Sequence, residues 1–262
     1  MSHIFSVFNQ AGGVAKTTLA MNLGYELAQL GQRVLLVDFD PQGTLTIFMG
    51  IEGWDLSTTI YDCLIANRPA TDVIHSAHGI DILPANLALG KAELELYHAP
   101  MREQKLHRVL EPLSEAYDLV IIDCPPSLGV ISYLALVTAD YVIVPLECEY
   151  KSYQGTDLLL QTIGKIQQEA NPELKIATFV PVKVSLQKSQ HQRVLAAIDA
   201  QLAQIAPIAS PIPDAIAFAD ASERCLPLSL YDRRHRAVEP LRNLSKQVLS
   251  IATTGQVEVL HA

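Results

Sequence analysis

The chain lacks the features that mark secreted, zinc-binding or membrane-spanning proteins. Its 262 residues include four cysteines, at positions 63, 124, 148 and 225, and no two of them form a C-x-x-C pair. This spacing supports neither a zinc site nor a disulfide framework and favours a reducing cytosol. No apolar run is long enough to span a bilayer, and no N-terminal stretch resembles a signal peptide. We therefore expect a cytoplasmic protein that does not act at a membrane.

Positive charge is also scarce. The chain has 19 Lys and Arg against 28 Asp and Glu, a net charge of −9, which argues against a generic nucleic-acid binder. The deficit lies in residues 1–150, which have a balance of −11, whereas residues 151–262 have a balance of +2. The acidic and the mildly basic parts are therefore segregated along the chain.

A glycine-rich turn, Asn9–Thr18, follows a short apolar run and precedes a segment with helical spacing. Strand, glycine-rich turn, Lys-Thr and helix form a phosphate-binding arrangement, because backbone N–H groups and a helix N-terminus favour an anion. Lys16 supplies a point charge for the outer phosphates, and the Thr17 hydroxyl can bind Mg²⁺. The alternative is a glycine-rich turn with a chance Lys-Thr, since the pattern G-x-x-x-x-G-K-[ST] requires glycine where this chain has Ala15. We expect the whole loop to hold phosphate: Ala11, Gly12, Gly13, Val14, Ala15, Lys16, Thr17 and Thr18.

Short apolar runs typical of buried parallel strands alternate with segments of helical spacing along the chain. This alternation predicts βαβ units and an α/β fold: a single P-loop NTPase domain over residues 1–262, with a mainly parallel twisted sheet and helices on both faces. The predicted strands cover residues 4–8, 34–37, 80–83, 119–122, 141–144 and 175–180. The predicted helices cover residues 19–28, 101–116 with a break near Pro112, 154–169, 188–204 and 236–252.

Three carboxylates stand at the ends of predicted strands, where ligands bind in an open parallel sheet. Asp38 and Asp40 are two residues apart on an extended segment, so they point the same way. They are candidates for orienting the attacking water and for holding magnesium-bound waters. Asp123 ends a later strand and would reach Mg²⁺ through water. Each could alone be an ordinary polar strand end, but their order after the glycine-rich turn favours a nucleotide triphosphatase site.

Four segments together resemble the ParA/MinD-type ATPases with a deviant Walker motif. Residues 11–18 (AGGVAKTT), 34–42 (VLLVDFDPQ), 121–126 (IIDCPP) and 144–147 (VPLE) follow that family's patterns in order. The resemblance implies ATP hydrolysis with Mg²⁺, an ATP-bound sandwich homodimer and non-specific DNA binding on the nucleoid. It also implies an adaptor protein, encoded nearby, and a cargo such as a carboxysome, plasmid or chromosome. By the same resemblance, Pro213 and Asp214 approach the adenine.

One residue departs from this family. Each partner of the family's dimer inserts a lysine into the other's site, and that position is Ala11 here. Lys151 is the candidate replacement, with Glu147 and Glu149 completing a trans-acting cluster. The alternative is a solvated helix start, where acids are favourable and Lys151 is merely exposed. The missing lysine is also a feature of the McdA subgroup, which positions carboxysomes, and the chain is similar to that subgroup in this respect.

Two basic segments are candidates for contact with DNA. No acidic residue lies between Leu174 and Ile198, and a second run of arginines begins at position 233 and is followed by Arg242 and Lys246. Non-specific phosphate contacts need such charges and no base-reading residues. The alternative is a solvated helical face. The expected DNA contacts are Lys183, Lys188, Arg193, Arg233, Arg234 and Arg236.

Three rival functions remain. A MinD-like membrane-cycling ATPase needs a basic amphipathic C-terminal helix, and residues 247–262 contain no Lys or Arg. A metabolic relative sharing the P-loop is the second rival; in its iron–sulfur reductase form it needs paired cysteines at a dimer seam. The third is a nucleotide-sensing scaffold with little turnover, which steady-state ATPase measurements would distinguish.

Overall fold

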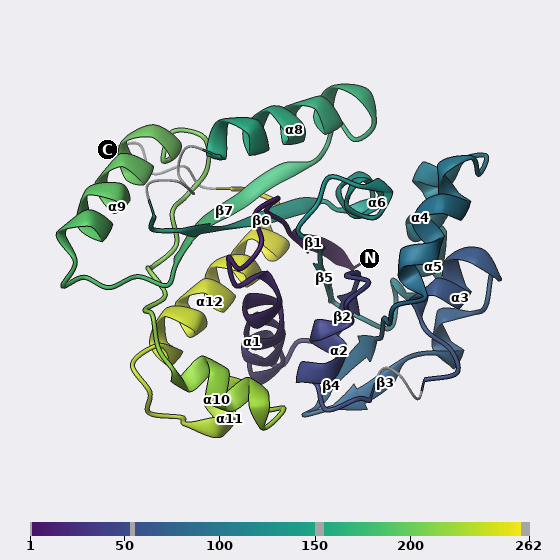
Figure 1. Ribbon diagram of the computed structural model, residues 1–262, viewed down its shortest axis with the longest axis horizontal. Helices are drawn as coiled ribbons and strands as arrows, with labels where there is room; N and C mark the ends of the chain where they lie inside the picture. The colour runs from purple at the N-terminus through teal and green to yellow at the C-terminus, as the bar shows by residue number, and fades with distance from the viewer. Residues whose placement is uncertain (1, 53–55, 150–154, 258–262) are drawn as a thin grey trace.

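A computed structural model describes residues 2–52, 56–149 and 155–257 (Figure 1). Within these ranges seven strands form one sheet in the order β3-β4-β2-β5-β1-β6-β7, and every neighbouring pair is parallel except β3 with β4. The strands are β1 (His3–Val7), β2 (Val34–Asp38), β3 (His75–Ala77), β4 (Ile80–Leu83), β5 (Leu119–Asp123), β6 (Tyr141–Glu147) and β7 (Lys175–Val182). The predicted α/β fold with a mainly parallel sheet is confirmed.

Helices cover both faces of the sheet. Successive side chains of a strand point to opposite sides, and here both sides are apolar, so each face needs a covering layer. In β2, Leu35 and Val37 pack into one core while Val34 and Leu36 pack into the other. The first core is closed by α3 (Ile60–Ile65), α4 (Leu89–Tyr97), α5 (Lys105–Leu110), α6 (Val130–Thr138), α8 (Thr156–Glu169) and α9 (Ser189–Leu202). The second is closed by α1 (Lys16–Gln29), α2 (Thr44–Phe48), α10 (Ala217–Glu223), α11 (Leu228–Tyr231) and α12 (Val238–Thr254).

The predicted elements lie close to the observed ones. The six predicted strands are present, although β6 and β7 continue to Glu147 and Val182. The predicted helix at 101–116 is broken as expected: 3₁₀ turns η3 (Arg102–Gln104) and η4 (Glu111–Leu113) flank α5, and Pro112 lies in η4. β3 was not predicted; it has three residues and lies at the edge of the sheet.

The sheet brings the predicted chemistry to one edge. The carboxyl ends of β2, β5 and β1 are adjacent, with Asp38 opposite Asp123 and Asp123 opposite Val7. The glycine-rich turn leaves β1 at this same edge and leads into α1. None of the helices in the described ranges is long and apolar enough to cross a membrane.

Candidate functional site

The glycine-rich turn is fastened to its surroundings before α1 begins. The Asn9 side chain donates to the Pro145 carbonyl at 2.8 Å and accepts from the Ala11 N–H at 2.9 Å. Gly13 has φ +76°, a conformation that glycine adopts without steric cost. Ala15 has φ 59° and ψ 28°, so the position where the phosphate-binding pattern requires glycine is left-handed here. An alanine there keeps the loop geometry at a cost of about 1 kcal/mol.

Lys16 lies inside the turn rather than in solvent. Its side chain is buried, and its Nζ donates to the Ala11 carbonyl at 2.8 Å. Burial lowers the pKa of Lys16, and the nearby Asp123, Cys124 and Asp40 oppose that shift. The ammonium therefore lies between the turn and the acidic strand ends, with two further N–H donors available for phosphate oxygens.

Asp38 is fully buried and held by hydrogen bonds. Its Oδ2 accepts from both the N–H and the hydroxyl of Thr46 at 2.7 Å, and its Oδ1 accepts from the Asp40 N–H at 3.2 Å. Burial raises the pKa of Asp38 to about 6, although the Thr46 and Asp40 hydrogen bonds oppose the shift. Asp40 is only partly buried and accepts from the Gln42 N–H at 2.9 Å. Of this pair, Asp40 is the more accessible to a water molecule.

Asp123 is as deeply buried as Asp38 but lacks its hydrogen bonds. It is completely buried, and neither carboxylate oxygen has a hydrogen-bond partner of good geometry among the described residues, although the Thr17 hydroxyl lies close enough to lower its pKa. Burial and the neighbouring Asp38 outweigh that contribution and raise the pKa of Asp123 well above its usual range. A buried carboxylate is costly unless it is paired or coordinates a cation. This orphaned acid beside Thr17 fits the shell of a bound Mg²⁺.

The donor set also indicates which metals fit. Within the described ranges, no group of three or more His, Cys, Asp or Glu side chains is arranged to hold a metal ion. Mg²⁺ usually keeps several waters and uses only one or two protein ligands together with substrate phosphates. One hydroxyl, Thr17, and one carboxylate, Asp123, therefore suit Mg²⁺ delivered with a nucleotide and do not suit a structural zinc.

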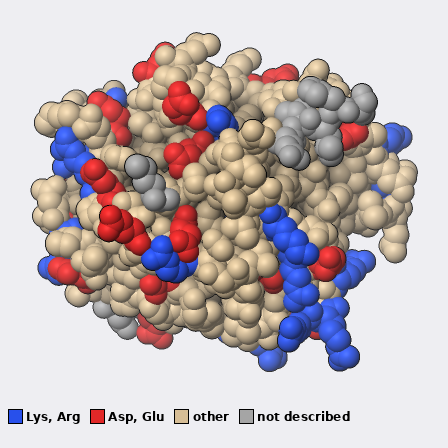
Figure 2. Space-filling model, turned by 180° about the vertical axis from the view of Figure 1, so that it is seen from behind, with Lys and Arg blue, Asp and Glu red and all other residues tan. Residues whose placement is uncertain are grey.

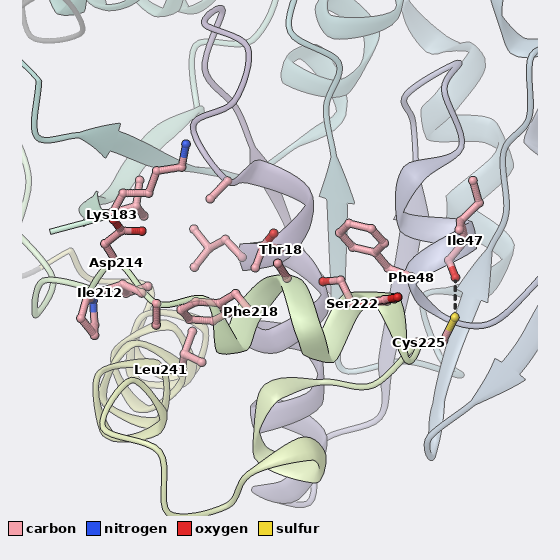
Figure 3. A pocket seen from close by; sticks show the side chains of 17 residues that line it. Thr18, Ile47, Phe48, Lys183, Ile212, Asp214, Phe218, Ser222, Cys225 and Leu241 are labelled. Carbon is pink, nitrogen blue, oxygen red and sulfur yellow. Dashed lines mark hydrogen bonds between the residues drawn. The ribbon is translucent and has the colours of Figure 1, made fainter.

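A cavity of about 580 Å³ opens beside the N-terminal turn of α1 (Figure 3). Lys183, Ile212 and Asp214 lie at one end, Phe48 and Cys225 lie toward the other, and Thr18 and Phe218 lie between them. This is the size of a small-molecule site, and the largely apolar wall next to the phosphate turn suits a nucleotide base.

The two residues predicted near the adenine, Pro213 and Asp214, line this cavity. Their loop is fixed, because the Asp214 N–H donates to the Val184 carbonyl at 3.0 Å and Arg236 donates to the Asp214 carbonyl at 3.2 Å. The structure thus brings both into one wall with Ala15 and Thr18. Their contact with adenine stays a prediction.

The predicted trans-acting cluster is only partly described. Glu147 forms an ion pair with Lys183 at 3.1 Å, and Glu149 lies 3.6 Å from the Nε2 of the buried His191. Lys151 lies outside the described residues. Lys183, which the sequence predicts to contact DNA, forms this ion pair while its side chain stays partly exposed, and its Nζ turns away from Asp214 in Figure 3. Lys183 therefore lines the rim of the cavity and is also partly exposed at the surface. Its contact with DNA stays a prediction.

The other residues expected to contact DNA fall into two groups. Lys188 and Arg193 are exposed at the start of α9. The run at 233–236 adjoins α12, and Arg233 lines a groove with Arg242 and Lys246 between α1, α11 and α12. Figure 2 shows Lys and Arg side chains gathered in a band toward the edge where the C-terminal helices lie. Arg242 also pairs with the buried Glu26 at 3.4 Å, so part of its charge is already balanced.

Several residues of the site were not predicted from the sequence. Thr46 orients Asp38 from α2, and Asn9 fastens the turn. Phe48 and Phe218 form cavity walls from helices that are far apart in the sequence. A glycine at position 43, just before α2, is the local sequence feature that could have indicated the turn carrying Thr46. In the structure Gly43 has φ +63°, and a Cβ there would lie 2.8 Å from the Ala85 carbonyl.

Comparisons with known proteins agree with this geometry. A family model described as "AAA domain" matches residues 2–176. Sporulation initiation inhibitor protein Soj of Bacillus subtilis is 36% identical over 250 residues, covering 95% of this chain and 98% of Soj. Chromosome partitioning protein ParA of Myxococcus xanthus is 33% identical over 95% of this chain and 88% of its own length.

A solved structure is similar over the full length of both chains. It is a cobyrinic acid a,c-diamide synthase from Mycobacterium smegmatis with a bound ATP analogue and magnesium, with a TM-score of 0.88 and 32% identity. That structure holds an ATP analogue and magnesium. The glycine-rich turn, Thr17 and Asp123 of this chain have side chains and backbone groups suited to the same kinds of ligand.

Proposed function

This chain belongs to the ParA/MinD family of P-loop ATPases, and on that premise we propose that it partitions or positions a cargo by a cycle of ATP-dependent DNA binding. In this cycle ATP closes a sandwich homodimer, the dimer binds DNA without regard to base sequence, and hydrolysis releases it. An adaptor protein couples the cycle to the cargo. The activity that drives the cycle is hydrolysis of ATP with Mg²⁺.

The single observation that supports this function most directly is that the buried Lys16 of the turn lies near Asp123, a buried carboxylate without a hydrogen-bond partner of good geometry in the described ranges. Lys16 and the turn N–H groups would bind the phosphates, while Thr17 and Asp123 would hold Mg²⁺. When bound, the metal ion neutralises phosphate charge as the terminal bond breaks.

The remaining acids orient water at the same edge. Asp38 is locked by Thr46 and positions the start of the loop that carries Asp40. Asp40 has a carboxylate close enough to the surface to accept a hydrogen bond from the attacking water. Replacing either acid with alanine should leave ATP binding intact, slow hydrolysis and accumulate the dimer.

The basic band supports the DNA step. Its cations lie on the C-terminal helices and their preceding loop, and a dimer would present two copies of them. Because phosphate contacts release counterions, affinity should fall steeply with salt. This step also accounts for a location on the nucleoid despite the acidic net charge.

The test combines association with DNA binding. Sedimentation velocity with the slowly hydrolysed analogue ATPγS and Mg²⁺ should show a dimer, and the same protein with ADP should show a monomer. Fluorescence anisotropy with two unrelated DNA duplexes should show equal affinity, present only with ATPγS. A monomer under both conditions, or equally tight DNA binding without nucleotide, would contradict the proposal.

A metabolic ligase is the second candidate, and the similarity to a cobyrinic acid diamide synthase favours it. Amidation that takes ammonia from glutamine commonly uses a reactive cysteine thiolate. Of the cysteines here, Cys63, Cys124 and Cys148 are buried, and burial raises the pKa of each thiol. Cys225 is the remaining one, and it donates to the Ile47 carbonyl at 3.3 Å. Incubation with ATP, glutamine and cobyrinic acid tests this candidate directly by the appearance of amidated product.

The subgroup and the cargo are finer questions. The absence of lysine at Ala11 is the basis for the McdA hypothesis, and the three relatives compared above do not distinguish McdA from chromosome or plasmid partitioning proteins. Carboxysome positioning therefore stays a prediction, to be tested by the identity of the adaptor encoded beside this chain.

A further inference from the structure

A second cavity, of about 360 Å³, lies between α3 with its following 3₁₀ turn η2 (Ala70–Asp72) and α5 with η4. Three cations line it: Arg68, Lys105 and Arg108. Residues 1–150 contain only seven Lys and Arg against 18 Asp and Glu, so three of those seven cations converge on one cavity in the acidic part of the chain. Such a concentration of charge requires an explanation that the nucleotide site does not supply.

These cations are not neutralised inside the protein. None of the three is in an ion pair within the described ranges, and Arg108 donates only to the neutral Gln104 side chain, at 2.9 Å, and to the Met101 sulfur, at 3.7 Å. The acids on the elements around the cavity are Asp62, Asp72, Glu103 and Glu111. Asp62 accepts from the Thr59 N–H at 2.8 Å as a helix cap, and Asp72 accepts from the neighbouring Thr71 hydroxyl at 3.4 Å.

The surroundings of the cavity are apolar and partly uncovered. Cys63, Ala70 and Leu113 are buried beneath it. Beside it, Tyr97 and Met101 remain 61% and 51% exposed, unusually high for such large side chains.

Contacts join these apolar side chains to the basic cavity. Met101 touches Arg108, and the Arg102 guanidinium stands 5.5 Å from the centre of the Tyr97 ring. Arg, Tyr and Met are residues that protein interfaces favour. We call this region the α4–α5 surface and define it as Arg68, Tyr97, Met101, Arg102, Lys105 and Arg108.

We propose that the α4–α5 surface docks an acidic segment of the adaptor protein, with carboxylates over the cavity and apolar side chains against Tyr97 and Met101. The inference rests on the proposed function, because it assumes that an adaptor exists. Charge complementarity selects the acidic partner. A second copy of this chain is disfavoured, because a symmetric contact would bring the same three cations together.

The position of the surface suits an adaptor that responds to nucleotide. The loop after Asp123 ends at Gly129, which caps α6. Glu93 of α4 closes over Gly129 so tightly that a Cβ there would lie 1.8 Å from its Oε1. Helix α6 in turn packs against η3 and α5. A segment bound on the α4–α5 surface therefore touches the helices that contact the loop beside the phosphates.

The test uses a set of labelled 12-residue peptides in which Asp or Glu alternates with Leu or Phe at helical or extended spacing. A matched set carries Lys in place of each acid. Fluorescence anisotropy with the full-length protein should show binding of acidic peptides only. The double variant Lys105→Glu with Arg108→Glu should weaken that binding roughly tenfold or more. The control reverses two exposed cations elsewhere, Lys165→Glu with Lys175→Glu, and should bind as the wild type does.

Three results would overturn the inference: no acidic peptide binds, the reversal at 105 and 108 leaves affinity unchanged, or that reversal abolishes the ATPγS-dependent dimer. The last result would assign the surface to self-association. If circular dichroism shows that the double variant does not fold, the single variant Arg68→Ala replaces it, with an expected loss of about threefold. ATPγS-dependent DNA binding, measured in parallel, tests the proposed function separately, since the acidic peptides do not report on it.

Discussion

Asp123→Asn should make this protein more stable and a worse ATPase. The carboxyl is fully buried, lacks a hydrogen-bond partner of good geometry in the described ranges and faces Asp38, so its ionised form is disfavoured when Mg²⁺ is absent. Asparagine has nearly the same shape and no charge. The substitution therefore removes an electrostatic penalty while also removing the group that we assign to the metal shell.

The size of the effect follows from proton linkage. A carboxyl whose pKa is raised by folding costs stability that grows as pH rises from its unfolded pKa, near 3.9, up to its folded pKa. Each pH unit in that window contributes about 1.4 kcal/mol, so the cost at pH 7 is at most about 4 kcal/mol. We expect Asp123→Asn to be more stable than wild type at pH 7, by no more than this limit, and to lose most of that advantage near pH 4.

Urea denaturation in EDTA without nucleotide, at pH 5 and pH 7, measures this difference. The matched control is Asp199→Asn, because Asp199 is an exposed aspartate on α9 and its replacement should change stability by less than about 0.5 kcal/mol. A thermal-shift series with ADP and increasing Mg²⁺ then measures the cost to the site. Mg²⁺ should raise the melting temperature of the wild type more than that of the variant.

Two outcomes refute the reasoning. If Asp123→Asn is less stable than wild type at pH 7, the buried Asp123 carboxyl does not destabilise the folded protein. If the stability difference is the same at pH 5 and pH 7, the substitution acts through packing and not through ionisation. An unchanged response to Mg²⁺ would separately remove Asp123 from the metal shell.

Four further predictions follow from the same site. Lys16→Ala should abolish nucleotide binding in calorimetry, because the phosphates lose their main fixed charge. Ala15→Gly should raise the free energy of unfolding by about 0.5–1 kcal/mol by relieving the left-handed φ, whereas Ala196→Gly in the middle of α9 should lower it by about 1 kcal/mol. Replacing Arg233, Arg234 and Arg236 with alanine should weaken DNA binding without changing ATP affinity, and each lost phosphate contact should reduce the slope of log K against log salt by about 0.9. Lys151→Ala should leave the monomer folded but reduce the ATPγS-dependent dimer in sedimentation; equal dimer fractions would return Lys151 to a solvated helix start.

The phosphate turn and the strand ends could be predicted from sequence because their signals are local. The turn is contiguous, and parallel strands bring their carboxyl ends to one edge whatever their order, so Asp38 and Asp123 had to share that edge. They lie opposite each other because β2 and β5 are neighbours in the sheet. Elements that depend on tertiary packing could not be predicted from local sequence patterns. β3 is only three residues long and gains its pairing from β4, and the hydrogen bonds from Thr46 to Asp38 arise only because α2 turns back over β2.

The base cavity illustrates a different limit. Its wall combines α2 with the loop after β7 and with α10, both of which lie more than a hundred positions further along the chain, and no sequence pattern specifies that they meet. Lys183 shows the same limit at the level of charge. A basic residue in an acid-free segment favours DNA contact in the sequence. The sequence does not show that Glu147 lies opposite Val182 in the β6–β7 pair and forms an ion pair with Lys183, the next residue.

The electrostatics of the site give a physical reason for coupling nucleotide to conformation. Burial disfavours the charged forms of Lys16, Asp38 and Asp123 together, and only Asp38 is well supplied with hydrogen bonds. These groups lie against the turn and the loop after Asp123, so bringing in a polyphosphate with Mg²⁺ changes the charge balance of both loops at once. Since that second loop leads through Gly129 and α6 to the α4–α5 surface, the same change reaches the place where we expect the adaptor. The strain at Ala15 and the unpaired carboxyl at Asp123 are thus destabilising features that the packed cores on both faces of the sheet can tolerate. A bound nucleotide with Mg²⁺ would offset the cost at Asp123, so we expect it to stabilise the nucleotide-bound form relative to the free one.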